Sequence, residues 1–415
     1  MISALELAGC AVAAALIWVV GARSRWIPLA LSAVFLALGC VLAVQLLKST
    51  TPLVPHWVTG LGSLSPSRIA AGLLLGGVAA LGLEAIVAGD AAPTAAAQAV
   101  MLALLGAAFI LVSTDSLVVV AAAAGTLMGA VWLRWQRVVG PQLTVRSVAR
   151  QSVLAFSSWL AAAVILPGVR TGSSPPVLVA ILITLALVGL LGVMPFSALV
   201  GAAIRLGRTE AFYWRLLFLP AGALLEARAI ALSPPVVALP LRELLIGLGL
   251  ATALYWGARA LLGPDQGRYF RILACDSGLV CVAIALGTVE GLAAALILVV
   301  VHWLSGAVLS DPRGTRSQLL AWIGISGLPP FGGFTGRLLA VLAAVSLSPT
   351  LAALVLLVGG LQLGSAAAGM RSALRPGRAP LTRVAELLGL GVALLTMILG
   401  LVPVPAIHLL FGLRT

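Results

Sequence analysis

The feature that most constrains this chain is a succession of apolar runs, each long enough to cross a lipid bilayer. A transmembrane helix needs about 20 apolar residues, and about fourteen such runs alternate with short, arginine-bearing loops. Hydrophobic residues make up 61% of the 415 residues and charged residues only 9%, against about 25% charged residues in soluble domains. This composition excludes a soluble enzyme, a secreted disulfide protein and a disordered chain. We expect an all-α polytopic membrane protein with spans at 2–22, 26–47, 66–88, 94–113, 115–134, 150–168, 176–203, 212–232, 241–262, 270–288, 290–310, 317–345, 348–370 and 386–412.

The arginines are divided unequally between alternate loops. One side of the membrane receives Arg23, Arg25, Arg134, Arg137, Arg146, Arg205, Arg208, Arg259, Arg268, Arg313, Arg316, Arg371, Arg375, Arg378 and Arg383. The opposite side receives only Lys48, Arg68, Arg170, Arg242 and Arg414. Because basic loops stay in the cytoplasm, the arginine-rich side is predicted to face inward across a bacterial-type inner membrane, with both termini outside. The net charge of +13 therefore reflects orientation, and we expect no nucleic-acid partner.

Two of the predicted spans are interrupted by residues that break a helix. Pro195 lies near the middle of 176–203, and 317–345 contains Pro329 and Pro330 followed by Gly332 and Gly333. Paired interruptions five helices apart are typical of transporters built from inverted repeats. We therefore predict two five-helix repeats, over helices four to eight and nine to thirteen. The expected organisation is a three-helix segment at 1–93, a first repeat at 94–232, a second at 241–370, and a loop with a C-terminal helix at 371–415.

Four sequence segments occur in the order found in one known family. SGLPPFGGFTGRLLAV at 326–341 resembles its "GIPP–x–x–GF–x–GK" helix, and RILACDSGLVCVAIAL at 271–286 is similar to its "KRLLAYSSI–x–x–x–G–x–x–L–x–G" helix. VARQSVLAFSSWL at 148–160 and GVMPFSALV at 192–200 match two further motifs more weakly. The family is that of the antiporter-like subunits of respiratory complex I, shared with Mrp-type sodium/proton antiporters and membrane-bound hydrogenases. The N-type subunit is the nearest in character.

The resemblance implies a proton relay that this sequence largely lacks. In the family, a glutamate of helix five pairs with a lysine of helix seven, and further lysines pass protons along the membrane midplane. The corresponding positions here fall near Ala124 or Gly125, Leu190, Ala221 and Gly306, and two of the family's other lysines are replaced by Arg150 and Arg337. The chain contains one lysine, Lys48, against 24 arginines. Because arginine stays charged, it is a poor proton carrier.

Charged groups within membrane spans are functional candidates, because burying them in lipid is costly. The candidates for a proton or ion pathway are Arg150, Arg271, Asp276, His302, Arg337, Glu84 and Glu226. Arg150 and Glu84 could instead lie at helix ends near the membrane surface. Arg271 and Asp276 could pair with each other or with a neighbouring helix. We find no nucleotide loop, metal-ligand set, haem motif or iron–sulfur cysteine cluster, so we expect no bound cofactor and no redox chemistry in this chain.

The resemblance favours an antiporter-like membrane-arm subunit of a complex-I-like assembly that moves protons or cations under redox control. It implies other membrane subunits and lipids as partners, with indirect coupling to a redox arm. The missing helix-five glutamate and helix-seven lysine leave a second possibility, a structural subunit that does not conduct. Two others stay open. One is the membrane component of a two-component inorganic-carbon importer with a soluble zinc-bearing partner. The other is a secondary transporter that works alone.

Overall fold

The computed structural model describes residues 143–206, 218–309, 316–374 and 383–402. Within these ranges all regular structure is helical and no strand occurs. The first five predicted spans, the 1–93 segment and Glu84 lie outside the described residues, so the fourteen-helix count and the inverted repeats stay predictions. The helices are α6 (Leu143–Arg170), α7 (Pro176–Leu191), α8 (Ala198–Leu206), α10 (Leu219–Leu232), α11 (Pro235–Leu262), α12 (Arg268–Ala285), α13 (Val289–Leu309), α14 (Arg316–Ser326), α15 (Gly332–Leu347), α16 (Pro349–Ala373) and α17 (Arg383–Leu401).

The helix boundaries follow from local sequence signals. Helices α7, α11 and α16 each begin with a proline, which is compatible with the first turn because that turn needs no backbone N–H donor. Helix α11 therefore starts at Pro235, six residues before the predicted span at 241–262, and takes Pro240 into its first turns. The predicted span at 290–310 matches α13 within one residue at each end.

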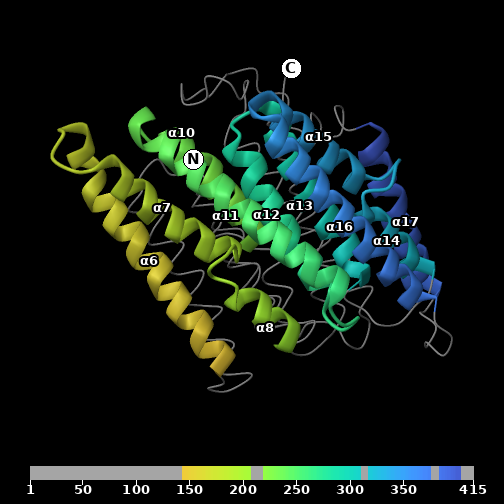
Figure 1. Ribbon diagram of the computed structural model, residues 1–415. Helices are drawn as coiled ribbons and strands as arrows, with labels where there is room; N and C mark the ends of the chain where they lie inside the picture. Colours follow the sequence, from red (N-terminus) through yellow and green to blue (C-terminus); the bar gives the residue numbers. More distant parts are fainter. Residues whose placement is uncertain (1–142, 207–217, 310–315, 375–382, 403–415) are drawn as a thin grey trace, which may run out of the picture.

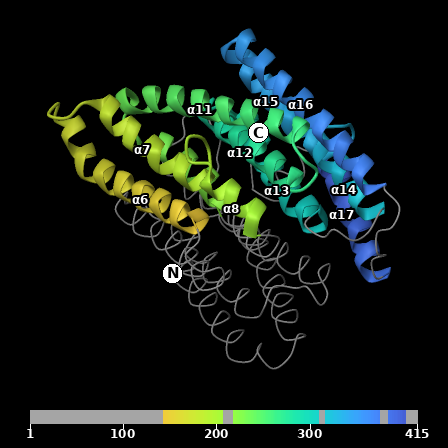
Figure 2. The same ribbon diagram turned by 60° about the horizontal axis from the view of Figure 1, so that its bottom comes forward.

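The helices run side by side in a slanted bundle, with α12 and α13 at its centre (Figure 1). Figure 2 shows these two helices between α7 and α11 on one side and the α14–α17 group on the other. Their sequences explain this position, since both are apolar around most of their circumference and are buried on nearly every face. Helices α6 and α16 instead leave many leucines and valines exposed. Among the described helices, four are long and apolar enough to cross a membrane, namely α6 (through Arg146–Val169), α11, α13 and α16. The chain is a multi-pass membrane protein.

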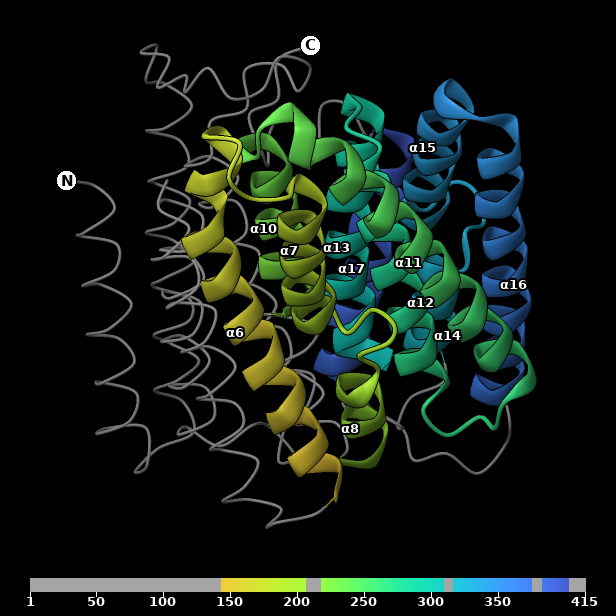
Figure 3. The same ribbon diagram turned by 60° about the vertical axis from the view of Figure 1, so that its left-hand side comes forward.

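The first predicted interruption is present and separates α7 from α8. Helix α7 ends at Gly192, whose φ of 71° is left-handed and therefore suits a residue without a Cβ. The Met194–Pro195 peptide that follows is cis. The Met194 backbone N–H donates to the Thr252 hydroxyl of α11 at 2.8 Å, so a side chain of another helix satisfies the broken ladder. Figure 3 shows α8 continuing below α7 after this loop.

The second predicted interruption separates α14 from α15. It begins at Gly327, which has a φ of 84°, and contains the cis Pro329–Pro330 peptide. The Ser326 hydroxyl accepts a hydrogen bond from the Leu328 backbone N–H at 3.2 Å. The Thr335 hydroxyl donates to the Gly400 carbonyl oxygen of α17 at 2.9 Å. As at the first break, a side-chain hydroxyl accepts a hydrogen bond from a backbone N–H of the interruption.

Candidate functional site

A four-residue polar cluster lies in the centre of the bundle, beside the second break. Each member comes from a different helix: Asp276 from α12, His302 from α13, Arg337 from α15 and Gln362 from α16. All four side chains are buried, and His302 and Gln362 have no exposed surface. The surrounding helices are almost wholly apolar, so these side chains must satisfy one another.

Asp276 is the centre of the cluster, and both of its carboxylate oxygens accept hydrogen bonds. Oδ2 lies 2.7 Å from His302 Nε2 and 3.0 Å from Arg337 Nη2. Oδ1 lies 2.5 Å from Gln362 Nε2 and 3.3 Å from Arg337 Nη2. Three side chains from three other helices therefore donate to one carboxylate, which offsets the cost of removing it from water.

Arg337 is fixed by the broken helix as well as by Asp276. Its Nε donates to Gln362 Oε1, and its Nη1 donates to the Gly333 carbonyl oxygen at 3.2 Å. The break leaves room for the guanidinium, because a Cβ placed on Gly327 or Gly333 would lie 3.0 or 3.3 Å from Arg337 Nη1. The glycines of this motif therefore let the guanidinium lie against the backbone of the break.

His302 contributes the imidazole of the cluster, and each of its two ring nitrogens can hold a proton. Its Nε2 faces a carboxylate oxygen, so Nε2 carries the hydrogen in the neutral ring and Nδ1 is an acceptor. Nδ1 is buried and has no hydrogen-bond partner among the described residues. The Tyr269 hydroxyl donates to the His302 carbonyl oxygen at 3.5 Å, and the two rings lie 6.0 Å apart. The cluster thus combines a fixed ion pair with an imidazole that has a free acceptor.

The structure brings together Asp276, His302 and Arg337 but not the other predicted residues. Arg271 does not pair with Asp276; it donates to the carbonyl oxygens of Pro264 and Gln266 at 2.7 and 3.0 Å and so closes the loop before α12. Asp276 therefore pairs with side chains of neighbouring helices and not with Arg271 of its own helix.

Arg150 and Glu226 also lie away from the cluster. Arg150 is exposed on α6. The adjacent Gln151 is buried instead, and its Nε2 donates to the Gly189 carbonyl oxygen of α7 at 2.7 Å. Glu226 is fully buried on α10.

The residues of the two breaks differ in exposure, and one member of the cluster was not predicted. Pro195 and Pro329 are exposed, Pro330 is half-buried, and Gly332 and Gly333 are buried. Gln362 was missed. The signal available for it was a single glutamine within the otherwise apolar span 348–370. In the part of the chain that the structure describes, no group of three acidic, histidine or cysteine side chains could hold a metal ion.

Solved structures with the same fold come from several membrane complexes. A chain of respiratory complex I from Thermus thermophilus with bound aureothin is 18% identical, with a TM-score of 0.77 over 97% of this chain and 98% of that one. A chain of the membrane-bound sulfane sulfur reductase, an archaeal respiratory membrane complex, is 16% identical, with a TM-score of 0.80 over 99% of this chain and 77% of that one. A chain of the Mrp complex from Dietzia sp. DQ12-45-1b is 19% identical, with a TM-score of 0.74 over 99% of this chain and 52% of that one.

These likenesses show that the chain shares its fold with chains of respiratory complex I, the sulfane sulfur reductase and the Mrp complex. They agree with the resemblance inferred from the four sequence segments. No family model matches the sequence, and no curated protein matches it.

Proposed function

We propose that this chain is an antiporter-like membrane subunit of a complex-I-like, redox-driven assembly, and that it moves protons through the Asp276–His302–Arg337–Gln362 cluster. The observation that carries the proposal is the position of this cluster, buried beside a broken helix in a fold shared with chains of respiratory membrane complexes. Ionisable groups at such a position are costly and mark ion pathways by default.

In this proposal His302 is the proton carrier. A proton arriving from an internal water binds Nδ1, while the Nε2 hydrogen stays directed at Asp276 Oδ2. The Asp276 carboxylate stabilises the resulting imidazolium, and the positive charge of Arg337 opposes it. A small change in the distance between Asp276 and Arg337 then favours loading or release of the proton. Arg337 acts through the electrostatic field of its guanidinium.

The assembly supplies the driving force in this proposal. Neighbouring membrane subunits cover part of the exposed apolar surface, lipids cover the rest, and a redox arm acts on the chain indirectly. We place the chain in a bacterial-type inner membrane with its arginine-rich loops in the cytoplasm and both termini outside, as the charge pattern predicts. We propose no cofactor for this chain.

A specific observation favours a second function, that of a non-conducting structural subunit. The Asp276–Arg337 pair is neutral as a unit and is closed by Gln362, so it could hold three helices together without moving any proton. The two functions make different predictions. If the role is structural, Arg337→Ala disrupts assembly while His302→Gln changes nothing. If the cluster conducts, His302→Gln stops translocation in an assembled complex.

The assembly itself is tested by solubilising native membranes in a mild detergent, affinity-purifying this chain and identifying the proteins that co-purify. Membrane subunits together with iron–sulfur subunits are the expected result. A lone soluble zinc-bearing partner would contradict the proposal and favour a two-component importer, and isolation of the chain alone would favour a free-standing transporter. Translocation through the cluster would be contradicted if Arg337→Ala and His302→Ala both left assembly and ion movement unchanged. Arg146→Gln, which changes an exposed arginine of α6, is the control.

A further inference from the structure

A second acidic group lies deep in the bundle, apart from the cluster. Glu226 is on α10, and its side chain has no exposed surface. Neither carboxyl oxygen has a hydrogen-bond partner among the described residues. The thiol of Cys281 lies beside the carboxyl of Glu226 but donates its hydrogen bond to the Leu245 carbonyl oxygen, at 3.6 Å. Glu226 is therefore the least satisfied acid in the described part of the chain.

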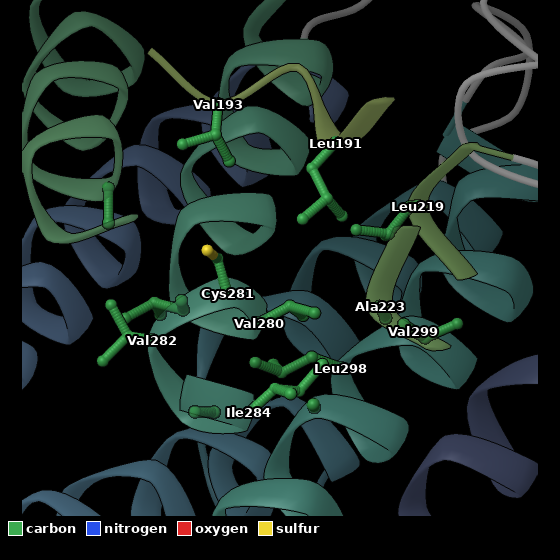
Figure 4. Close-up of a cluster of buried hydrophobic side chains, with 14 of the residues drawn as sticks. Leu191, Val193, Leu219, Ala223, Val280, Cys281, Val282, Ile284, Leu298 and Val299 are labelled. Carbon is green, nitrogen blue, oxygen red and sulfur yellow. The ribbon is translucent and has the colours of Figure 1, made fainter. Parts of the chain in front are cut away.

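The surroundings of Glu226 are apolar. Figure 4 shows Cys281 on α12 among apolar side chains from α7, the loop after α7, α10, α12 and α13. Those labelled are Leu191, Val193, Leu219, Ala223, Val280, Val282, Ile284, Leu298 and Val299. Ala223 lies one turn before Glu226 on α10, and α10 contacts both α12 and α13. No described residue offers this carboxyl a cation.

The contrast with Asp276 indicates what each acid does. Asp276 receives hydrogen bonds from three side chains, one of them an arginine, and is stable as a carboxylate. An ionised Glu226 would have none of these, and an unpaired charge in apolar surroundings is strongly disfavoured. Glu226 is stable only with its proton bound. It would lose that proton when water or a proton acceptor reaches it.

Helix α12 links Glu226 to the cluster. Cys281, beside Glu226, follows Asp276 by five residues, which places the two about 7.5 Å apart along the helix axis. This separation is too long for a hydrogen bond. Water entering between α10, α12 and α13 would bridge it. The His302 ring is hydrogen-bonded to Asp276 through Nε2, and its unpartnered Nδ1 is an acceptor for a proton released by Glu226.

We propose that Glu226 is a second proton-binding site of this chain and that it exchanges its proton with His302 through transient internal water. The proton leaves the Glu226 carboxyl and binds His302 Nδ1, so both groups are neutral before the transfer, and Glu226 is a carboxylate and His302 an imidazolium after it. This inference rests on the proposed function for the transport step. The bound proton on Glu226 does not depend on it.

The bound proton is tested with dicyclohexylcarbodiimide, an apolar reagent that reacts with protonated carboxyl groups in membranes. The carboxyl oxygen adds to the carbodiimide carbon, the carboxyl proton passes to a reagent nitrogen, and acyl transfer leaves a stable acylurea. The intact complex in native membranes is labelled, and its peptides are identified by mass spectrometry. We expect the adduct on Glu226, none on Asp276, and none at this position in Glu226→Gln. Labelling of Asp276 without Glu226, or no labelling of either, would overturn the proposal.

The transport step is tested with Glu226→Gln, which keeps the size of the side chain but cannot carry a proton. We expect normal assembly and proton translocation reduced by about tenfold or more. Glu243→Gln, which changes an exposed acid of α11, should match the wild type. If Glu226→Gln translocates protons like the wild type while His302→Gln does not translocate them, the transport role of Glu226 is overturned and the proposed function is not. Wild-type translocation in both variants would overturn the proposed function, and labelling would still decide whether Glu226 holds a proton.

Discussion

Arg337 Nη2 lies 3.0 Å from Asp276 Oδ2, an ion pair that joins the helix after the second break to the central helix α12. Both side chains are buried, and Gln362 of α16 hydrogen-bonds to each of them. The pair therefore fixes α15, α12 and α16 relative to one another. His302 adds α13 to this group. The second break, which interrupts the helix formed by α14 and α15, therefore lies where side chains of α12, α13 and α16 stabilise it.

Removing one partner of the ion pair should destabilise the protein strongly. Arg337→Met leaves Asp276 as an uncompensated buried charge, and we expect a loss of about 3–5 kcal/mol. The measurement is thermal unfolding of the detergent-solubilised protein. The double variant Asp276→Leu/Arg337→Met removes both charges, and it should be more stable than Arg337→Met. A double variant whose loss equals the sum of the two single losses would contradict an interaction between the residues.

Gln362 should contribute through its two hydrogen bonds. Gln362→Leu keeps a similar volume but leaves Asp276 Oδ1 and Arg337 Nε each without one partner. We expect a loss of about 1–3 kcal/mol, the cost of unsatisfied buried polar groups. Unfolding in detergent measures it, with Leu356→Ala as the control, because Leu356 is exposed on the same helix. Equal stability of Gln362→Leu and the wild type would contradict the network.

The first break offers a comparison between two threonines. Thr252 and Thr184 are both buried, and each hydroxyl donates to the carbonyl oxygen four residues earlier, at 2.7 and 2.8 Å. Only Thr252 also accepts a hydrogen bond from the Met194 backbone N–H. Thr252→Val should therefore cost about 1–3 kcal/mol more than Thr184→Val, because it leaves that N–H unsatisfied. Equal losses would show that Thr252 does not stabilise the break.

Glycine is required where Arg337 lies against the second break. Gly327→Ala forces a Cβ onto a left-handed backbone and toward Arg337 Nη1. We expect a loss of about 1–3 kcal/mol from the backbone alone. Gly359→Ala is the control, because nothing lies near its Cβ position in α16. The two variants are compared by thermal unfolding. A neutral Gly327→Ala would contradict the close approach.

Much of the described fold follows from hydropathy and from proline and glycine positions. The spans at 290–310 and 348–370 match α13 and α16 closely because a long apolar run permits no other structure in lipid. Both breaks were located because prolines in apolar runs interrupt the backbone ladder. The predicted span at 241–262 begins six residues after α11 does, because Pro235 and Pro240 lie within the helix and not before it.

The site was only partly predictable, since a single sequence does not say which helices are neighbours. Asp276, His302 and Arg337 stood out as charged or titratable groups in apolar spans. Their convergence depends on the packing of α12, α13 and α15, which hydropathy does not determine. Gln362 carries no charge and gave too weak a signal. Arg271 was grouped with the pathway, and its guanidinium donates to backbone carbonyls of the loop before α12.

The central claim, that the cluster moves protons through His302, is tested most directly by proton uptake. The purified complex is reconstituted into liposomes with its redox partners, and acidification is followed with a pH-sensitive dye. His302→Gln keeps a donor toward Asp276 but cannot carry a proton. We predict a fully assembled complex with intact electron transfer and translocation reduced by about 100-fold through this chain. Proton uptake equal to that of the wild type would contradict the claim and favour the structural role.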